Sequence, residues 1–313
     1  MKNKPDIIAI VGPTGVGKTS LAINVASILP QKTGYDSSEI ISCDSRQIYR
    51  EMDIATAKPT NDEISKTKHH LIDFVSPLSE NFSAAIYVEM ANKKIKEILN
   101  KNFLPIIVGG TGLYFKSLLG KFDIPKVPPN FELREKLNQK SNEELHKILT
   151  EKDPVLAEKI HPNNKNKVVR AIEVIEELKI PMSQAQKKKE SPYNILWVGL
   201  DARKRDFLYD RINKRCEKML EQGLLKELKK LLNKYGEIDL IKATIGYSEF
   251  LPYLKGEITI EDAIDKFKQH TRNYAKRQLS WFRADKNINW FYVDETDEKQ
   301  ILEGIIKLCL SKS

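Results

Sequence analysis

The stretch IIAIVGPTGVGKT, residues 7–19, joins a short apolar run to a glycine-rich turn and then to a helix-forming segment. Ile7–Val11 is apolar throughout and rich in β-branched residues, which predicts a strand buried in a parallel sheet. Residues 12–19 have the spacing G-x-x-x-x-G-K-T, typical of a loop whose backbone amides cradle phosphate oxygens. The alternative is a chance glycine-rich turn that happens to fall between a strand and a helix. The stretch therefore predicts a phosphate or diphosphate site at the end of the first strand.

Each residue type in this loop has a physical role. The glycines let backbone amides converge, Lys18 adds a positive charge, Thr19 can hold Mg²⁺, and the following helix adds its dipole. We therefore expect Mg²⁺ as the cofactor, with Thr19 as its ligand. The expected diphosphate-binding residues are Gly12, Pro13, Thr14, Gly15, Val16, Gly17, Lys18 and Thr19.

Short apolar runs alternate with helical patterns along the first and last thirds of the chain. This alternation predicts a parallel sheet with helices on both faces, an α/β fold of the P-loop NTPase type. The expected strands are Ile7–Val11, Glu39–Cys43, Leu104–Val108, Ile195–Leu200 and Trp290–Val293, and the expected helices in this part include Lys18–Leu29, Ser83–Leu99 and a long one from Arg205.

The pattern changes after Gly120, where prolines mark a joint and about seventy residues read as helices only. The helical candidates are Glu132–Leu137, Asn142–Leu149 and Lys165–Leu178. We therefore expect residues 1–121 and 194–313 to form the α/β core with C-terminal helices. Residues 122–193 are expected to form an inserted, all-helical domain.

Two polar side chains follow predicted strands directly. Asp44 follows Glu39–Cys43, and Thr111 comes after two glycines at the end of Leu104–Val108. Ligands of parallel sheets bind at the carboxyl ends of strands, so Asp44 is the candidate acid. The alternative for Asp44 is a turn cap, and Thr111 can equally be a turn hydroxyl or a ligand contact.

Composition bounds the remaining possibilities. The 313 residues include 52 Lys and Arg and 43 Asp and Glu, which gives a net charge of +9. The apolar runs are far too short to span a bilayer, and the first of them breaks at Gly12-Pro13 without a cleavage site. Three scattered cysteines offer neither a disulfide framework nor a zinc pair. We expect a cytoplasmic protein with no membrane partner, and a polyanion is a reasonable ligand.

The pair His69-His70 has no third ligand at a suitable spacing, so a hydrogen-bonded structural role is favoured over a metal site. A second charged stretch, residues 266–286, carries seven Lys and Arg against one acid, with Tyr274, Trp281 and Phe282 interleaved. Cations neutralise phosphates and aromatic rings stack on unpaired bases, which suits single-stranded RNA. The alternative is an amphipathic helix whose aromatic residues face the core.

Together these motifs resemble the bacterial tRNA isopentenyltransferase family, the tRNA dimethylallyltransferases. The similarity runs in the family's order over almost the whole chain. It rests on GPTGVGKT at 12–19, DSRQIYREMDIATAKP at 44–59, HHLIDF at 69–74, FSAAIY at 82–87, VGGTGLY at 108–114, DPVLAEKIHPNNKNKVVRAIEV at 153–174, IGYSEF at 245–250 and TRNYAKRQLSWFR at 271–283. Ala55 departs from the family, which generally has glycine there, and Ser248 replaces a commonly basic residue.

The resemblance implies transfer of a dimethylallyl group from its diphosphate to the exocyclic N6 amine of the tRNA adenosine just 3′ of the anticodon, position 37, in tRNAs that read codons beginning with U. It implies catalytic roles for Asp44, Thr19, Arg205 and Arg211. Asp44 would be the base, and Arg205 or Arg211 would act on the leaving diphosphate. The implied partners are the anticodon stem-loop of tRNA and dimethylallyl diphosphate, and we expect a monomer.

The resemblance also implies a set of tRNA contacts, distributed over the core and the insertion. They are Asp44, Ser45, Arg46, Gln47, Thr111, Arg134, Asn166, Lys167, Val168, Val169, Arg170, Thr244, Ile245, Gly246, Tyr247, Lys276, Arg277, Gln278 and Arg283.

Two other enzyme classes share part of this pattern. A P-loop kinase for a small molecule would use the loop alone, and a prenyltransferase for free adenine nucleotides would share the chemistry. The prenyltransferase for free nucleotides would not need the helical insertion or the basic stretch, and the kinase would consume ATP without requiring tRNA. A pure RNA-binding module has no use for a complete phosphate loop.

Overall fold

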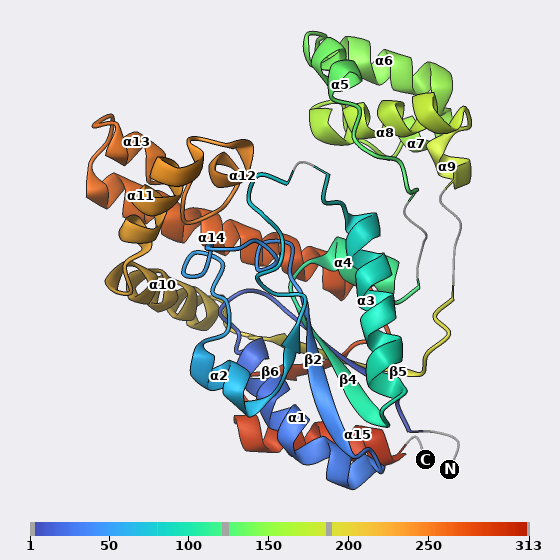
Figure 1. Cartoon of the computed structure of the whole chain (residues 1–313), viewed down its shortest axis with the longest axis vertical. Coiled ribbons are helices and arrows are strands. Elements are labelled where there is room, and N and C mark those ends of the chain that lie inside the picture. The colour runs from blue at the N-terminus through green and yellow to red at the C-terminus, as the bar shows by residue number, and fades with distance from the viewer. Residues whose placement is uncertain (1–3, 80, 121–124, 186–189, 312–313) are drawn as a thin grey trace. The chain divides into compact units, whose positions relative to one another are not determined.

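The computed structural model describes residues 4–79, 81–120, 125–185 and 190–311 (Figure 1). The chain divides into two compact units. The core unit comprises residues 1–79, 90–115 and 193–313, and the helical unit comprises residues 80–89 and 116–192. The expected boundary between residues 121 and 122 lies outside the described residues.

The described residues of the core unit form one six-stranded sheet in which every neighbouring pair is parallel, in the order β3-β2-β4-β1-β5-β6. The strands are β1 (Ile7–Val11), β2 (Ser37–Cys43), β3 (His69–His70), β4 (Phe103–Gly109), β5 (Ile195–Asp201) and β6 (Asn289–Tyr292). Because β1 is central, the loop that follows it emerges between the carboxyl ends of β4 and β5.

The sheet is covered on both faces. Ile8 and Ile10 of β1 belong to a cluster with α1 (Lys18–Thr33) and α15 (Glu298–Ser311). The alternate residues Ile7 and Ala9 point to the other face, and they are also fully buried. This two-sided burial explains why the strands are continuous apolar runs, and it confirms the predicted α/β class.

The remaining helices of the core unit lie in sequence both before and after the helical unit. They are α2 (Asn61–Lys66), α3 (Ala84–Leu99, which continues from the helical unit), α10 (Arg205–Glu221), α11 (Leu224–Tyr235), α12 (Asp239–Lys242), α13 (Leu251–Leu254) and α14 (Ile260–Arg283). α10 packs against both α11 and α14, and α1 packs against α15 (Figure 1). The capping box of Thr259 and Asp262 starts α14, the longest of these helices.

The helical unit is built from short helices whose described residues include no strand. They are α5 (Phe131–Asn138), α6 (Asn142–Lys152), α7 (Pro154–Ala157), α8 (Lys165–Leu178) and α9 (Met182–Ala185), and α4 (Gly112–Leu118) enters it from the core unit. Leu145 and Leu149 of α6 pack against Val168 and Ile172 of α8. Asn130 and Ser141 cap α5 and α6 with their side chains. In the described part of the chain, no helix is both long and apolar enough to cross a membrane.

Candidate active site

The phosphate loop, Gly12–Thr19, connects β1 to α1 and is shaped by its glycines. Gly17 has φ 103°, in the left-handed region where a side chain is strained. A Cβ added to Gly12 would lie 2.4 Å from the carbonyl oxygen of Leu200 at the end of β5. Glycine therefore lets the loop fold against β5 while the first amides of α1 stay available to an anion.

Lys18 is held inside the loop with its charge incompletely compensated. Its Nζ donates to the carbonyl oxygen of Pro13 at 2.7 Å. Burial and, to a smaller extent, the nearby Arg215 lower the pKa of Lys18 to about 7, although the charge of Asp44 opposes the shift. An anion placed beside Lys18 would raise this pKa again, because it would favour the protonated ammonium.

Two arginines of α10 face the same loop. Arg211 Nε donates to the carbonyl oxygen of Gly15 at 2.9 Å. Arg215 is four residues further on, so it shares the face of Arg211, and burial lowers its pKa. The sequence interpretation named Arg211 and missed Arg215, although the spacing of four residues along a predicted helix was a usable signal.

Asp44 directly follows strand β2 and begins a tight turn. Its Oδ1 accepts hydrogen bonds from the backbone N–H groups of Arg46 at 2.8 Å and Gln47 at 3.4 Å. Within the described part of the chain, its Oδ2 accepts no hydrogen bond. Asp44 is thus a turn cap through one oxygen, and the other oxygen remains available to a substrate.

Thr111, which follows β4, holds the turn at Asp44, and Gln278 of α14 holds the phosphate loop. Thr111 Oγ1 accepts the N–H of Ser45 at 3.0 Å. Gln278 Oε1 accepts the N–H of Thr14 at 2.8 Å, and its Nε2 donates to the carbonyl oxygen of Gly110 at 3.1 Å. The Gln278 side chain therefore ties the phosphate loop to β4 and is itself buried.

Tyr274 of α14 is a further residue near the carboxylate. Burial raises the pKa of its phenol, the charge of Asp44 raises it further, and a hydrogen bond with Thr111 acts in the opposite sense. Sequence reasoning noted Tyr274 only as an aromatic in a basic stretch. Its neighbourhood to Asp44 depends on the tertiary path of α14, which no local pattern reveals.

Comparison with known proteins identifies the family. The model of the family described as IPP transferase matches residues 47–285. The tRNA dimethylallyltransferase of Natranaerobius thermophilus is 42% identical, covering 100% of this chain and 93% of its own. The chain belongs to the IPP transferase family, and it is a transferase.

Other members of this family agree over the same length. The tRNA dimethylallyltransferase of Acetivibrio thermocellus is 46% identical over 96% of this chain and 95% of its own. Among solved structures, the tRNA isopentenylpyrophosphate transferase of Staphylococcus epidermidis is 37% identical, with a TM-score of 0.71 over 99% and 100% of the two chains. A eukaryotic dimethylallyltransferase acting on tRNA is 29% identical, with a TM-score of 0.77 over 94% of this chain and 75% of its own.

The segments that the family resemblance assigns to tRNA differ in how accessible they are. In the core unit, Arg46 Nη2 donates to the carbonyl oxygen of Ala243 at 3.1 Å, next to the turn at 244–247. Thr244 and Tyr247 of that turn are buried, as is Gln278. The side chains of these three residues are therefore buried within the core unit, and the tRNA contacts that the resemblance implies for them stay predictions.

In the helical unit, four of the predicted tRNA contacts already have structural partners, and their contact with tRNA stays a prediction. Val168 and Val169 lie in the unit's apolar core, so their side chains face away from solvent. Arg134 and Arg170 are bound to the carboxylate of Glu173, whose side chain is only 1% exposed. The two valines are therefore core residues, and the two arginines already hold a structural ion pair.

Glu173 is the centre of this arrangement. Arg134 donates to it through Nε and Nη2, each at 2.8 Å, Arg170 donates through Nη1, and the N–H of Asn130 adds a bond of 2.6 Å. These hydrogen bonds lower the pKa of Glu173 even though burial opposes them. By contrast, Asn166 and Lys167 at the start of α8 are exposed.

The remaining predicted basic residues of the core unit are either paired with an acid or exposed. Arg283 Nη2 donates to Asp201 Oδ2 at 2.5 Å, and Arg205 Nη1 lies 3.8 Å from Asp201 Oδ1. Arg205 is therefore paired at the end of β5, whereas Arg211 contacts the phosphate loop directly. Lys276 and Arg277 of α14 are exposed.

His69 and His70 form the short edge strand β3. His70 Nε2 is 2.6 Å from Glu39 Oε2, and His69 Nδ1 is 2.7 Å from the carbonyl oxygen of Thr67. Burial lowers the pKa of both imidazoles. These contacts confirm the predicted structural role.

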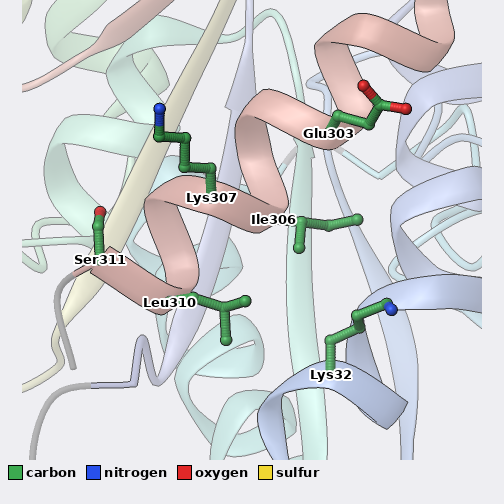
Figure 2. Close-up of a pocket in the computed structure, with 6 residues that line it drawn as sticks. All are labelled: Lys32, Glu303, Ile306, Lys307, Leu310 and Ser311. Carbon is green, nitrogen blue, oxygen red and sulfur yellow. The ribbon is translucent and has the colours of Figure 1, made fainter.

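One surface depression lies elsewhere, at the other end of α1 from the phosphate loop. It measures about 590 Å³ and is open to solvent. Ile306 and Leu310 project from α15 toward Lys32 of α1 (Figure 2). It contains none of the predicted site residues.

Proposed function

We propose that this transferase moves a dimethylallyl group from dimethylallyl diphosphate to the N6 amine of adenosine 37 in tRNA, in tRNAs that read codons beginning with U. The observation that carries the proposal is the arrangement at the strand ends. A carboxylate, Asp44, stands beside a phosphate loop that gathers Lys18, Arg211 and Arg215. The full-length similarity to tRNA dimethylallyltransferases supports the choice of substrates.

Asp44 would act as the general base. The lone pair of an adenine amine is delocalised into the ring, so the amine is a poor nucleophile. A positioned carboxylate removes its proton as the new N–C bond forms. Asp44 Oδ1 is engaged by the turn amides, which leaves Oδ2 to face the amine.

The phosphate loop would hold the leaving group. Attack occurs at the allylic carbon, and the C–O bond to the diphosphate breaks. Lys18, Arg211 and the loop amides stabilise the charge that develops on the diphosphate oxygens. The lowered pKa of Lys18 supports this role, because the site is short of negative charge before the diphosphate binds.

Mg²⁺ is the expected cofactor, and Thr19 would hold it. Among the described residues, no group of three His, Cys, Asp or Glu side chains could hold a metal ion by itself. A threonine hydroxyl together with diphosphate oxygens and water nevertheless suits Mg²⁺, which takes few protein ligands. When bound there, the ion would neutralise charge on the departing diphosphate.

The target base must leave its stack to reach Asp44. Exposed basic residues of each unit are suited to hold the anticodon arm. In the core unit these are Lys276 and Arg277, and in the helical unit Lys167, which follows the exposed but uncharged Asn166. We also expect a monomeric, cytoplasmic enzyme with no membrane partner.

The decisive experiment uses tRNA carrying A37 and radiolabelled dimethylallyl diphosphate, followed by nuclease digestion and mapping of the label. Label at A37, and none in tRNA carrying G37, is the expected result. Label on free adenine nucleotides would favour the alternative prenyltransferase. Phosphate transfer from ATP to a small molecule without tRNA would favour the kinase.

A further inference from the structure

Glu227 of α11 receives an unusual set of hydrogen bonds. Its Oε2 accepts the N–H groups of Asp53 at 2.9 Å and Ile54 at 2.8 Å. Its Oε1 accepts the N–H of Ala55 at 3.2 Å and the hydroxyl of Tyr247 at 2.6 Å. One carboxylate thus binds three consecutive amides of one loop and a buried tyrosine of another.

The partners of Glu227 are dipoles rather than cations. Across the described residues, no Lys, Arg or His forms an ion pair with it. Its negative charge is therefore held by backbone amides and a phenol, and that charge raises the pKa of Tyr247, which burial already raises. Hydrogen bonds to an ionised acceptor are roughly twice as strong as neutral ones, so this contact is well suited to fix the loop.

The loop that Glu227 holds leads back to the catalytic turn. Gln47 Nε2 donates to the carbonyl oxygens of Thr56 at 3.3 Å and Ala57 at 3.0 Å. Ser42 at the end of β2 donates to Gln47 Oε1 at 2.9 Å. The 53–57 loop is therefore bonded on one side to Glu227 and on the other to the turn that contains Asp44.

A second connection runs through the turn at residues 244–247. Tyr247 OH donates to Glu227, and Arg46 Nη2 donates to the carbonyl oxygen of Ala243. Gly246 in this turn has φ 94°, and a Cβ added there would lie 3.1 Å from the Ala55 side chain. The two loops thus pack closely where Glu227 joins them.

We propose that Glu227 is a positioning residue for prenyl transfer. It fixes the position of the Asp44 turn relative to the 244–247 turn around the incoming adenosine. The inference rests on the proposed function, since it assigns the adenosine to that place. Glu227 acts through Asp44 and through Tyr247, and it touches neither substrate.

The central test is Glu227→Gln in the full chain. The amide keeps the shape of the side chain but presents an NH₂ group to backbone N–H donors. We expect the single-turnover rate at saturating tRNA and dimethylallyl diphosphate to fall about 10- to 100-fold, the range for losing hydrogen bonds to a charged group. The dissociation constants of both substrates should stay within about threefold, since the phosphate loop and the exposed basic residues are unchanged.

Tyr247→Phe provides a second variant that keeps the buried ring. It removes one of the four bonds, so its rate loss should be smaller and in the same direction. The double variant should lose less than the product of the two single losses, because both act on one contact. A product of independent losses would contradict the inference.

Glu51→Gln is the matched control. Glu51 also reaches α11, but it accepts from the side chains of Lys234 and Tyr235 and holds no loop amide. Its rate should stay within about twofold of wild type.

A purely structural role for Glu227 predicts a different outcome. In that case the rate loss would follow the fraction of enzyme able to bind diphosphate, and it would disappear well below the melting temperature. Either that result, or equal rates for Glu227→Gln and wild type, would overturn the inference. Failure of the wild-type enzyme to label A37 would instead overturn the proposed function.

Discussion

The phosphate-loop end of the core unit and the centre of the helical unit both gather arginines and a carboxylate, but they use them differently. At the phosphate loop, Lys18 and Arg211 donate to backbone carbonyl oxygens, and one oxygen of Asp44 is unused within the described chain. In the helical unit, Arg134 and Arg170 donate to Glu173.

The difference distinguishes charged groups that can bind a ligand from charged groups that already stabilise the fold. A cation bonded to a carbonyl oxygen can exchange that weak partner for a phosphate. A cation that leaves a buried carboxylate leaves that charge buried and uncompensated, which commonly costs about 3–5 kcal/mol. Changes at the phosphate loop should therefore affect chemistry and ligands, whereas changes at Glu173 should affect stability.

The largest expected effect is on the catalytic side of this comparison. Asp44→Asn keeps an oxygen to cap the turn but loses the basicity of the second oxygen. Single-turnover rates should fall about 10²- to 10⁴-fold, the usual contribution of a general base. The affinity for diphosphate and the melting temperature should change little.

Asp36→Asn, an exposed acid at the other end of β2, is the charge control and should keep the wild-type rate. If Asp44→Asn turned over within a few-fold of wild type, Asp44 would be a turn cap only.

On the structural side, Glu173→Ala should destabilise the helical unit by about 1.5–3 kcal/mol, because the hydrogen bonds that Arg134, Arg170 and the N–H of Asn130 make with its buried carboxylate are lost. Hydrogen exchange of the α6 and α8 amides in the full chain measures this. Since the folded pKa of Glu173 is lowered, its stabilising contribution is present above the unfolded pKa of about 4.5 and is lost as pH falls through the folded value. Equal protection of these amides in wild type and variant would contradict the structural role of Glu173.

Lys18 gives the next prediction, through its pKa of about 7 in the ligand-free enzyme. At pH 8 most Lys18 is neutral, so diphosphate binding should take up close to one proton. Affinity should fall by up to about tenfold per pH unit above 7. Calorimetry in buffers of different ionisation enthalpy measures the uptake.

Lys18→Met should abolish that uptake, while the exposed Lys307→Met should retain it. The sign of the stability effect is also defined. The folded pKa lies below the unfolded value of 10.5, so the folded state is penalised most below pH 7. Lys18→Met should therefore raise the melting temperature of the free enzyme at pH 6 and lose that advantage toward pH 10.

The fold could be predicted from the sequence because its signals are local. The strand before the phosphate loop was predicted with its observed bounds, and so was Lys165–Leu178. The two-residue strand β3 was missed, since two residues carry no periodicity.

The site was predicted less completely, because motifs identify segments and not side-chain directions. Within 166–170 the resemblance implied contacts for every residue, yet helical periodicity turns Val168 and Val169 to the core. The pairing of Arg134 with Glu173 joins positions 39 apart, which only the tertiary structure brings together.

The smallest expected effect concerns Arg277, whose exposed guanidinium lies 5.7 Å from the centre of the Tyr274 ring. Unlike Arg134 and Arg170, it has no carboxylate partner among the described residues and is free to meet a phosphate. If it does so, it displaces counterions when tRNA binds, and Arg277→Ala should reduce the slope of log affinity against log salt by about one unit. Filter binding at several salt concentrations measures this slope.

The comparison with the helical unit supplies the controls. Lys307→Ala removes a charge on α15, outside every matched motif, and should leave the slope unchanged. Arg134→Ala should lower stability and leave the slope unchanged, because its guanidinium neutralises Glu173 rather than a phosphate. The opposite result would be a wild-type slope for Arg277→Ala and a reduced slope for Arg134→Ala. It would mean that an arginine bound to a buried carboxylate contacts RNA. Pairing with a carboxylate would then not distinguish structural arginines from RNA-binding ones in this protein.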